Sequence, residues 1–366
     1  MKTTGPSIFS VSKQCRLHPL ISDKINQWYS TYGRQLAWRG TNDPYLIWLS
    51  EIIMQQTRVE QGTPYYLRFA EEYPMVSDLA KAKEDEVLKL WQGLGYYSRA
   101  RNLHHTAKTV MEKMNGSFPK TYNALIKLKG IGKYTAAAIA SISSEEMVAA
   151  IDGNVNRAVS RLFSITEAIH TSSFANQVYE HADLLISNQK PSRHNQAMMD
   201  FGAMVCTPKN PQCPICPVHE HCLAYQKGLV EQLPVKTKKT KKTDRYFHIA
   251  VVQSGNRTIV EKRDNQGIWA SLWQFPMIET KSKAPLSLDL FQEEVKARLK
   301  SIVNIAEAPK HILSHQNIHA IFYHIEADHI QKDLRNEPIK KLAEVALPRL
   351  IDRFLENHEW FKTKEK

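Results

Sequence analysis

The stretch Leu128-Lys129-Gly130-Ile131-Gly132-Lys133-Tyr134-Thr135-Ala136 decides the fold of the first part of this chain. Two glycines one residue apart allow a tight hairpin between helices, because neither carries a Cβ that would block the backbone. The amides of Gly130, Gly132 and the next helix start can then point outward together, which suits a phosphate. Such a hairpin holds nucleic acid by its backbone without reading base sequence. Taken alone, the pair favours an ordinary helix C-cap, and only the rest of the chain decides between the two.

Composition and charge point to a nucleic-acid partner. The 366 residues include 49 Lys and Arg against 37 Asp and Glu, a formal net charge of +12. Excess positive charge favours a polyanion, and no basic amphipathic helix stands out that would favour a membrane surface. Residues 1–12 lack the apolar segment of a signal peptide, and no apolar run could span a bilayer. We expect a soluble, cytoplasmic monomer that is nucleoid-associated if the source is bacterial.

Composition changes abruptly between residues 232 and 245. From Ile21 to about Tyr225, helix start signals such as Asp43-Pro44 recur and predict an all-helical region. Residues 234–243 are basic and almost without apolar side chains, which is typical of an extended linker. The length itself suggests roughly two or three domains. We assign an all-helical catalytic region to 1–230, with the hairpin at about 121–140, a basic linker to 231–245 and a further domain to 246–366.

The last part of the chain has a mixed pattern. Two β-rich runs are separated by Ser254-Gly255-Asn256, which is a hairpin signal. An amphipathic helix and another strand follow, so we expect a separate α/β domain of roughly a hundred residues. The strands are expected at 246–253, 258–262 and 318–325, and the helix at 288–299.

Four of the five cysteines lie in one proline-rich loop, 206–222, with the spacing C-x6-C-x2-C-x5-C. Cys15 stands apart and is expected to be an ordinary thiol. Four thiolates in one loop can close a tetrahedral zinc site or hold an iron–sulfur cluster, and the spacing alone does not choose between them. Either site has no open position for a substrate, so its role is structural. The predicted ligands are Cys206, Cys213, Cys216 and Cys222.

Two carboxyl groups are candidates for chemistry. On the helix predicted at 43–57, Glu51 shares a face with three apolar side chains, so its pKa should rise to that of a general acid. The alternative is a glutamate that extends into solvent or pairs with Arg58. Asp152 can cap the next helix, where amides and the helix dipole keep a carboxylate ionised. An ionised aspartate facing such a glutamate is also the pair that cleaves glycosidic bonds. The apolar neighbours of Glu51 are Ile47, Trp48 and Met54.

Several motifs together resemble the MutY family, the adenine DNA glycosylases of the helix-hairpin-helix superfamily. The resemblance runs from about Ile21 through the cysteine loop, whose spacing is that of the family's [4Fe-4S] loop. It implies this cluster as cofactor, and duplex DNA with adenine opposite 8-oxoguanine or guanine as substrate, the adenine being flipped out before release. The motifs are WLSEIIMQQT (48–57), GLGYYSRARNL (93–103), GIG (130–132), IDGNV (151–155) and NQAMMD (195–200).

The resemblance also assigns roles to residues. Glu51 matches the general acid that protonates adenine at N7, and Asp152 matches the carboxylate that stabilises the oxocarbenium ion, through a transient covalent adduct. Tyr134 and Asn154 match residues that support this site. Gln196 matches the residue that contacts the adenine edge.

The remaining expected contacts are to DNA. Gly130 and Gly132 would hold the backbone. Gln56 and Tyr96 match residues inserted in the base stack beside 8-oxoguanine. For Tyr96 and the adjacent Tyr97 the alternative is core packing, which the resemblance disfavours more for Tyr96.

The C-terminal domain resembles the family's MutT-like (Nudix-like) domain, which inspects 8-oxoguanine. The usual Phe-Ser-His loop is Leu313-Ser314-His315 here, so Ser314 and His315 can make polar contacts while the aromatic wedge is missing. Only a fragment, 292–294, stands where nucleotide pyrophosphohydrolases carry a glutamate-rich helix. We therefore expect no independent hydrolase activity. The predicted fold is an all-α helix-hairpin-helix domain with an iron–sulfur loop, followed by this α/β domain.

Two other functions compete with this hypothesis. A glycosylase that also cleaves the strand as an AP lyase needs a lysine amine two residues after the second glycine, but Tyr134 stands there and a phenol forms no imine. Lys133 is displaced by about 100° around the helix. Asn156 replaces a lysine that traps the abasic product in some family members. A non-catalytic lesion binder or iron–sulfur scaffold would need neither Glu51 nor Asp152. We therefore predict a monofunctional glycosylase with weak or absent lyase activity.

Overall fold

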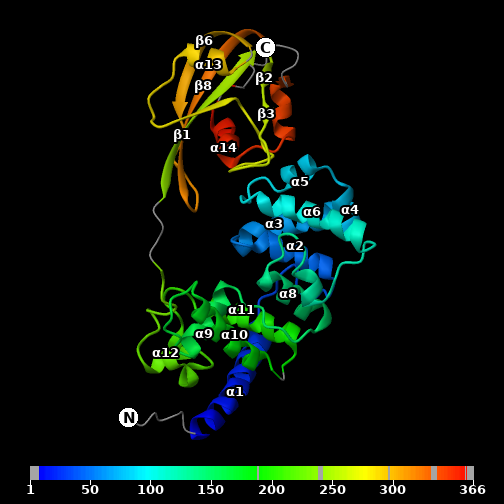
Figure 1. The fold of residues 1–366 in the computed structure, drawn as a ribbon, viewed down its shortest axis with the longest axis vertical. Coiled ribbons are helices and arrows are strands. Elements are labelled where there is room, and N and C mark those ends of the chain that lie inside the picture. The colour runs from blue at the N-terminus through cyan, green and yellow to red at the C-terminus, as the bar shows by residue number, and fades with distance from the viewer. Residues whose placement is uncertain are drawn as a thin grey trace. The chain divides into compact units, whose positions relative to one another are not determined.

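The computed structural model describes residues 8–187, 189–237, 242–295, 297–330, 336–358 and 360, and Figure 1 shows its fold. The chain forms two compact units. The first consists of Met1–Lys81 and Asn102–Lys238, and the second of Ala82–Arg101 and Lys239–Lys366. The sequence-based domain ranges placed 82–101 with the helical region, whereas its contacts group it with the C-terminal strands. Part of the predicted linker, 238–241, lies outside the described residues.

Helices build the first unit, as predicted. An aspartate and a proline start α2, where Asp43 accepts a hydrogen bond from the Tyr45 amide. The helix expected at 43–57 is shorter than predicted. It ends at Met54 because Gln55 takes a ψ of 116° and Gln56 a φ of 55°, neither of which continues a right-handed helix. The longer helices described in this unit are α1 (Ile8–Tyr32), α2 (Pro44–Met54), α3 (Val59–Glu72), α8 (Lys133–Ser144), α9 (Gly153–Leu162), α10 (Ser172–Ile186) and α11 (Pro191–Met204), together with α6 (Ser98–Lys113) from Asn102 onward.

The short elements of this unit are α4 (Val76–Lys81), α7 (Tyr122–Leu125), η1 (Cys213–Ile215), η2 (His219–His221) and α12 (Leu223–Gln226). Their order places α7 and α8 on either side of the glycine pair. One apolar core joins α1, α9, α10 and α11. It includes Ile25, Val159, Phe174 and Phe201, each at most 2% exposed. This core fixes α9 and α11, which carry most of the candidate site.

The two hairpin glycines have different reasons to be glycine. Gly130 has a φ of +80°, and a Cβ there would lie 2.7 Å from the Asn102 Cβ, so both conformation and space exclude a side chain. Gly132 has an extended backbone, with φ −88° and ψ 177°, and open space where its Cβ would lie. The fold therefore requires only Gly130. The open space at Gly132 leaves the start of α8 accessible.

A seven-stranded sheet forms the core of the second unit, with the path β6-β8-β1-β2-β9. The long strands β1 (Thr243–Ser254) and β8 (Gln316–Ile330) run parallel at its centre, and β6 (Ala297–Glu307) pairs antiparallel with β8. The predicted turn at Gly255 is present, because Ser254 pairs with Arg257. The sheet also contains β2 (Arg257–Ile259) and β9 (Asn336–Pro338), together with β5 (Met277–Thr280), which pairs with β1, and β7 (His311–Ile312), which pairs with β8. The strands β3 (Glu261–Lys262) and β4 (Trp273–Gln274) form a separate two-stranded sheet.

Alternate residues of the central strands face different helices. Phe247, Ile249 and Val251 share a core with α14 (Arg349–Asn357), whereas Ala250 and Val252 share one with α13 (Leu288–Glu294). This is the two-residue period of a strand buried on both faces. Figure 1 shows the two helices on opposite sides of the sheet. The predicted α/β class is confirmed.

The helix predicted at 288–299 is wrong in its second half. The structure ends α13 at Glu294 and starts β6 at Ala297. Ala297 and Leu299 are buried while Arg298 is exposed, which is strand alternation that short apolar runs share with helices. The Gln292 side chain accepts a hydrogen bond from the Leu299 amide at 2.9 Å and so ties the strand to the helix end.

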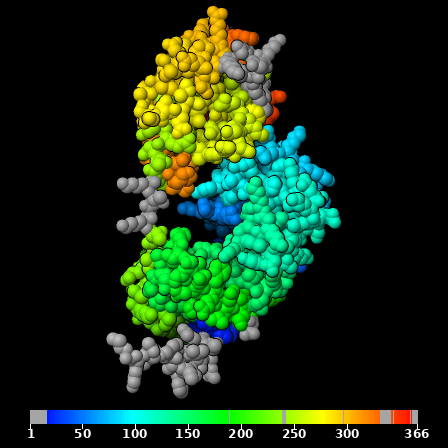
Figure 2. All heavy atoms as spheres, viewed as in Figure 1, coloured from blue at the N-terminus to red at the C-terminus, as the bar shows by residue number. Residues whose placement is uncertain are grey.

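Residues 82–101 belong to the second unit by their contacts. Figure 2 shows the heavy atoms of the chain in the view of Figure 1. The segment 82–101 includes α5 (Glu84–Leu90) and the motif from Gly93 onward. The Gln92 amide donates to Asp352 at 2.8 Å, and the Tyr97 hydroxyl donates to the Leu347 carbonyl at 3.3 Å. The second unit also contains the short helix η3 (Ile339–Glu344). Of the helices in the described ranges, none is long and apolar enough to cross a membrane.

Candidate active site

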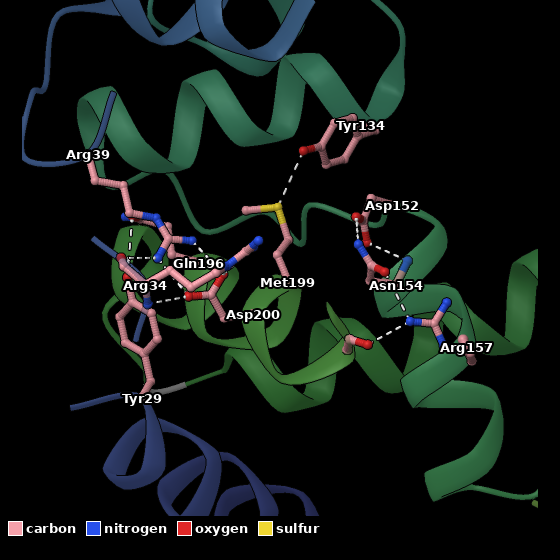
Figure 3. Close-up of polar contacts among 11 residues, drawn as sticks. Tyr29, Arg34, Arg39, Tyr134, Asp152, Asn154, Arg157, Gln196, Met199 and Asp200 are labelled. Carbon is pink, nitrogen blue, oxygen red and sulfur yellow. Dashed lines mark hydrogen bonds and ion pairs between the residues drawn. The ribbon is translucent and has the colours of Figure 1, made fainter. Parts of the chain in front are cut away.

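A cavity of about 210 Å³ lies in the first unit. Five predicted residues line it although they come from α2, α8, α9 and α11: Glu51, Tyr134, Asp152, Asn154 and Gln196. Residues that the sequence analysis did not single out line it too, among them Arg34, Trp38, Arg39, Thr57 and Met199. Figure 3 shows the polar contacts around it. The fold thus gathers candidate groups that are up to 145 positions apart in the sequence, from 51 to 196.

Glu51 has the protonation behaviour of a general acid. Its pKa is raised to about 7, chiefly by burial and to a smaller extent by the nearby Asp152 carboxylate. A hydrogen bond with Tyr134 and the charge of Arg39 act in the opposite direction but are weaker. Buried residues of α2 flank it, with Ile47 at 2% exposed. A carboxyl group with this pKa is about half protonated at neutral pH.

Asp152 caps α9, as the sequence suggested. One carboxylate oxygen accepts hydrogen bonds from the amides of Asn154 at 2.8 Å and Val155 at 2.7 Å, and the other accepts one from the Asn154 side chain at 2.7 Å. The capping amides, which were expected to keep Asp152 ionised, act against its burial. Burial raises the pKa of Asp152 by more than these hydrogen bonds and the charge of Arg157 lower it. The hydrogen bonds therefore offset the cost of burying a carboxylate beside the cavity.

Tyr134 connects two sides of the cavity. Its hydroxyl donates to the Met199 sulfur at 3.3 Å (Figure 3) and also contacts Glu51. Burial, together with the charge of Glu51, raises the pKa of Tyr134 well above its usual range. The phenol therefore stays protonated and can donate to a carboxylate. Lys133 lies elsewhere, with its ammonium group 5.6 Å from the centre of the Tyr179 ring.

A buried ion-pair cluster, which the sequence analysis missed, borders the cavity. Asp200 is fully buried and pairs with Arg34 at 2.6 Å and Arg39 at 2.7 Å. Burial raises the pKa of Asp200, but the hydrogen bonds from both arginines outweigh it, so the pKa is lowered overall. Asp200 closes the motif at 195–200, which was its only signal in the sequence. No local pattern connects it to arginines at 34 and 39.

Arg157 was also missed. Its guanidinium donates to the Asn154 side chain at 3.0 Å, to the Gly202 carbonyl at 2.6 Å and to the Cys206 carbonyl at 2.7 Å. Asn154 in turn donates to Asp152. Figure 3 shows this chain of contacts. Arg157 therefore links the carboxylate to the start of the cysteine loop.

Gln196 lies on the cavity wall with a held side chain. Its amide nitrogen donates to the Ser192 carbonyl at 2.9 Å, and its oxygen accepts from the Tyr29 hydroxyl at 3.5 Å. Gln56 is exposed at the end of α2, and Gly130 and Gly132 are exposed in the hairpin. These three residues do not belong to the cavity lining.

The four cysteines surround one small cavity, together with Arg161 and His219. Arg161 approaches the Cys206 sulfur to 3.5 Å, which suits a thiolate ligand. Burial raises the pKa of Cys216 to about 12, so only a bound metal would keep this thiol ionised. Within the described ranges, no three His, Cys, Asp or Glu side chains converge to hold a single ion. Four sulfurs around a shared cavity fit the larger iron–sulfur cluster.

The remaining predicted residues lie in the second unit. Tyr96, Ser314 and His315 line a cavity of about 370 Å³ together with Leu313 and Trp269. Tyr96 has a φ of 48° and is 52% exposed, whereas the adjacent Tyr97 is 6% exposed. The two tyrosines thus differ as expected, one open to solvent and the other in the core.

Three family models match the chain. The model of the HhH-GPD superfamily of base excision DNA repair proteins matches residues 49–181. The iron-sulfur binding domain of endonuclease III matches 206–222, and the NUDIX domain matches 248–357. These matches define the class: a helix-hairpin-helix DNA glycosylase with an iron–sulfur loop and a Nudix-like domain.

Relatives give the family. An adenine DNA glycosylase of Buchnera aphidicola subsp. Schizaphis graminum is 32% identical over 345 residues, which are 92% of this chain and 98% of the relative. The human adenine DNA glycosylase is 39% identical over 215 residues, 56% of this chain and 39% of the relative. The chain belongs to the MutY-type family of adenine DNA glycosylases, whose cofactor is a [4Fe-4S] cluster.

Solved structures agree with the fold. A thermostable thymine-DNA glycosylase is similar with a TM-score of 0.53 and 28% identity, over 58% of this chain and 98% of that one. An endonuclease III from a non-covalent DNA complex is similar with a TM-score of 0.51 and 22% identity, over 59% of this chain and 98% of that one. The second likeness concerns the fold alone.

Proposed function

We propose that this glycosylase removes adenine paired with 8-oxoguanine or guanine in duplex DNA and leaves the strand intact. The observation that carries the proposal is the convergence of Glu51, Asp152 and Tyr134 on one cavity, with a Glu51 pKa of about 7. A glycosidic bond breaks when its leaving base is protonated while charge on the sugar is stabilised. The three side chains supply the groups for both.

The reaction follows from their protonation states. Protonated Glu51 gives its proton to adenine N7, and the bond between the sugar C1′ and adenine N9 breaks with its electron pair going to the base. Asp152 stabilises the positive charge on the sugar, either as an ion pair or by a transient bond to C1′ that water replaces. Tyr134 holds Glu51 by a hydrogen bond and stays protonated throughout. Water then attacks C1′ and supplies the hydroxyl of the abasic product, while its remaining proton goes to the Glu51 carboxylate.

Adenine recognition is assigned to the wall of the same cavity. The Gln196 side chain, held by Ser192 and Tyr29, presents an amide to the base edge. The ion-paired Arg34 and Arg39 also border the cavity. Asp200 offsets one of their two positive charges, which lessens their repulsion of the protonated base.

We expect weak or absent AP lyase activity because, in the part of the chain that the structure describes, no amine lies where the sugar would bind. Of the described residues that line the cavity, none is a lysine. Lys133, the nearest candidate by sequence, lies over the Tyr179 ring. Without an amine at the sugar, no Schiff base forms and β-elimination is not promoted.

The other DNA contacts are proposed from exposure and open space. The exposed glycines Gly130 and Gly132 suit contact with the DNA backbone, and the accessible Gln56 and Tyr96 suit insertion into the base stack. The polar groups of Ser314 and His315 suit the edge of 8-oxoguanine. The cluster, held by the four cysteines, would brace the loop to which Arg157 is tied.

The test uses the purified protein and duplexes with adenine opposite 8-oxoguanine, guanine or thymine. We expect abasic sites opposite 8-oxoguanine and guanine, seen as strand breaks only after alkali. No breaks after alkali would reject the glycosylase, and equal breaks without alkali would reject the monofunctional mechanism. Size-exclusion chromatography with light scattering tests the proposed monomer.

A further inference from the structure

One buried amide lies where three parts of the candidate site meet. Asn195, on α11, is 2% exposed and does not line the cavity. Its side-chain oxygen accepts a hydrogen bond from the Ala150 amide at 2.9 Å. Its nitrogen donates to the Val148 carbonyl at 2.9 Å and to the Ser141 hydroxyl at 2.8 Å. The oxygen and both N–H groups of this amide are therefore engaged.

The first two bonds hold the segment that leads into Asp152. The Asn195 side chain accepts from the backbone amide of Ala150 and donates to the backbone carbonyl of Val148. A neighbouring strand would make the same pair of hydrogen bonds. Ala150 stands two positions before Asp152 and is 1% exposed. The path of the chain into the helix cap is therefore fixed by a side chain of another helix.

The third bond fixes α11 against α8. Ser141 stands seven residues after Tyr134, on the same face of α8, and Asn195 stands four before Met199, on the same face of α11. The Tyr134 contact with Met199 and the Ser141 contact with Asn195 are thus two successive links between these helices. A shift at one link moves the other.

We propose that Asn195 is a positioning residue for adenine release, which sets the placement of Asp152 relative to Tyr134 and the wall of the adenine cavity. It touches neither base nor sugar and acts through the segment 148–152 and through α8. The inference rests on the proposed function. An ordinary core amide would contribute only stability, whereas a positioning amide also affects the stabilisation of charge at the sugar. A misplacement near 1 Å changes rates by about 10²-fold.

The variants are graded. Asn195→Ala removes all three bonds. Asn195→Asp keeps the shape and the bond from Ala150 but turns an oxygen towards the Val148 carbonyl. Ser141→Ala removes one of these three bonds, the one that Asn195 donates to the Ser141 hydroxyl. We expect single-turnover adenine release opposite 8-oxoguanine to fall about 10- to 100-fold for the Asn195 variants and about 3-fold for Ser141→Ala, measured well below each unfolding temperature.

The matched control is Asn26→Ala. Asn26 donates to Gln189 at 2.8 Å and lies 3.3 Å from the His194 ring, so it is an amide that contacts the same region without touching 148–152. We expect this variant to lower the unfolding temperature but to keep the release rate within about 3-fold. An equal rate loss at equal loss of stability would show that Asn195 only stabilises the fold.

A binding measurement separates positioning from packing. Duplexes carry, in place of the adenosine, either a cationic pyrrolidine or a neutral tetrahydrofuran abasic analogue. Because Asp152 faces the sugar cation, Asn195→Asp and Asn195→Ala should weaken binding of the pyrrolidine about 10-fold and of the tetrahydrofuran less than 3-fold. Equal weakening of both, or of neither, overturns the inference. If the wild-type protein releases no adenine from any duplex, the proposed function itself has failed.

Discussion

The cavities of the two units are built on different principles. The first unit's cavity is bordered by helix ends and buried charges, with Asp152 in a helix cap and Asp200 clamped by two arginines. The second unit's cavity is bordered by turns, in which Tyr96 and Trp269 have φ values of 48° and 60°. The difference fits the proposed roles of the two cavities, because bond cleavage requires charges that are fixed before the substrate arrives, whereas recognition of a base relies on shape and a few polar groups.

We expect the largest effect from a variant that removes the proton donor of the first cavity and leaves the second cavity unchanged. Glu51→Gln keeps the shape but cannot donate a proton, so adenine release should fall by about 10²–10⁴-fold. Affinity for duplex DNA should stay within about 3-fold. Single-turnover release and a binding titration measure the two. Unchanged release would refute Glu51 as the acid, and lost binding would show that it also holds DNA.

The second largest effect is expected from the buried ion-pair cluster of Asp200, Arg34 and Arg39. Asp200→Asn leaves Arg34 and Arg39 without their counter-charge, and breaking a buried pair in this way destabilises by about 3–5 kcal/mol. Urea unfolding should show this loss. The control Asp85→Asn removes an exposed pair with Lys262 in the second unit and should change stability by less than about 1 kcal/mol. Similar losses for both variants would contradict the importance of burial.

The pH dependence tests Glu51 in two ways. Release needs its protonated form, so the rate should fall about tenfold per unit above a pH of about 7. The pKa of Glu51 in the folded protein lies above its ordinary value of 4.5, so this contribution to stability is complete below pH 4.5 and is lost as pH rises through 7. The loss is about 3 kcal/mol. Glu51→Gln should remove it, and an unchanged pH slope of unfolding in that variant would contradict the burial effect.

Local sequence pattern predicted which residues line the first cavity, but it predicted few of the contacts that surround them. Asp152 was expected from its helix-capping position and Glu51 from its apolar face, and both are properties of neighbouring residues. The Asp200 cluster and the Asn195 contacts join residues 45 to 166 positions apart, and no spacing encodes such pairs. The grouping of 82–101 with the C-terminal strands was not predicted either, because it depends on contacts between residues far apart in the sequence. At 288–299 the spacing of apolar residues fitted a helix and a strand equally well. The pairing of β6 with β8 makes the second half of this segment a strand.

The smallest expected effect concerns the second cavity. Ser314→Ala removes a hydroxyl that lies 3.0 Å from the His315 ring nitrogen on the cavity wall. If this hydroxyl contacts the oxidised edge, the preference for 8-oxoguanine over guanine opposite adenine should fall about 5- to 10-fold, because one hydrogen bond is lost. Release opposite guanine should not change, since the first cavity is intact. Leu313→Ala is the matched control, because it shortens an apolar neighbour without removing a hydrogen bond, so the preference for 8-oxoguanine over guanine should stay unchanged. An undiminished preference in Ser314→Ala would mean that the second cavity distinguishes the bases by shape alone.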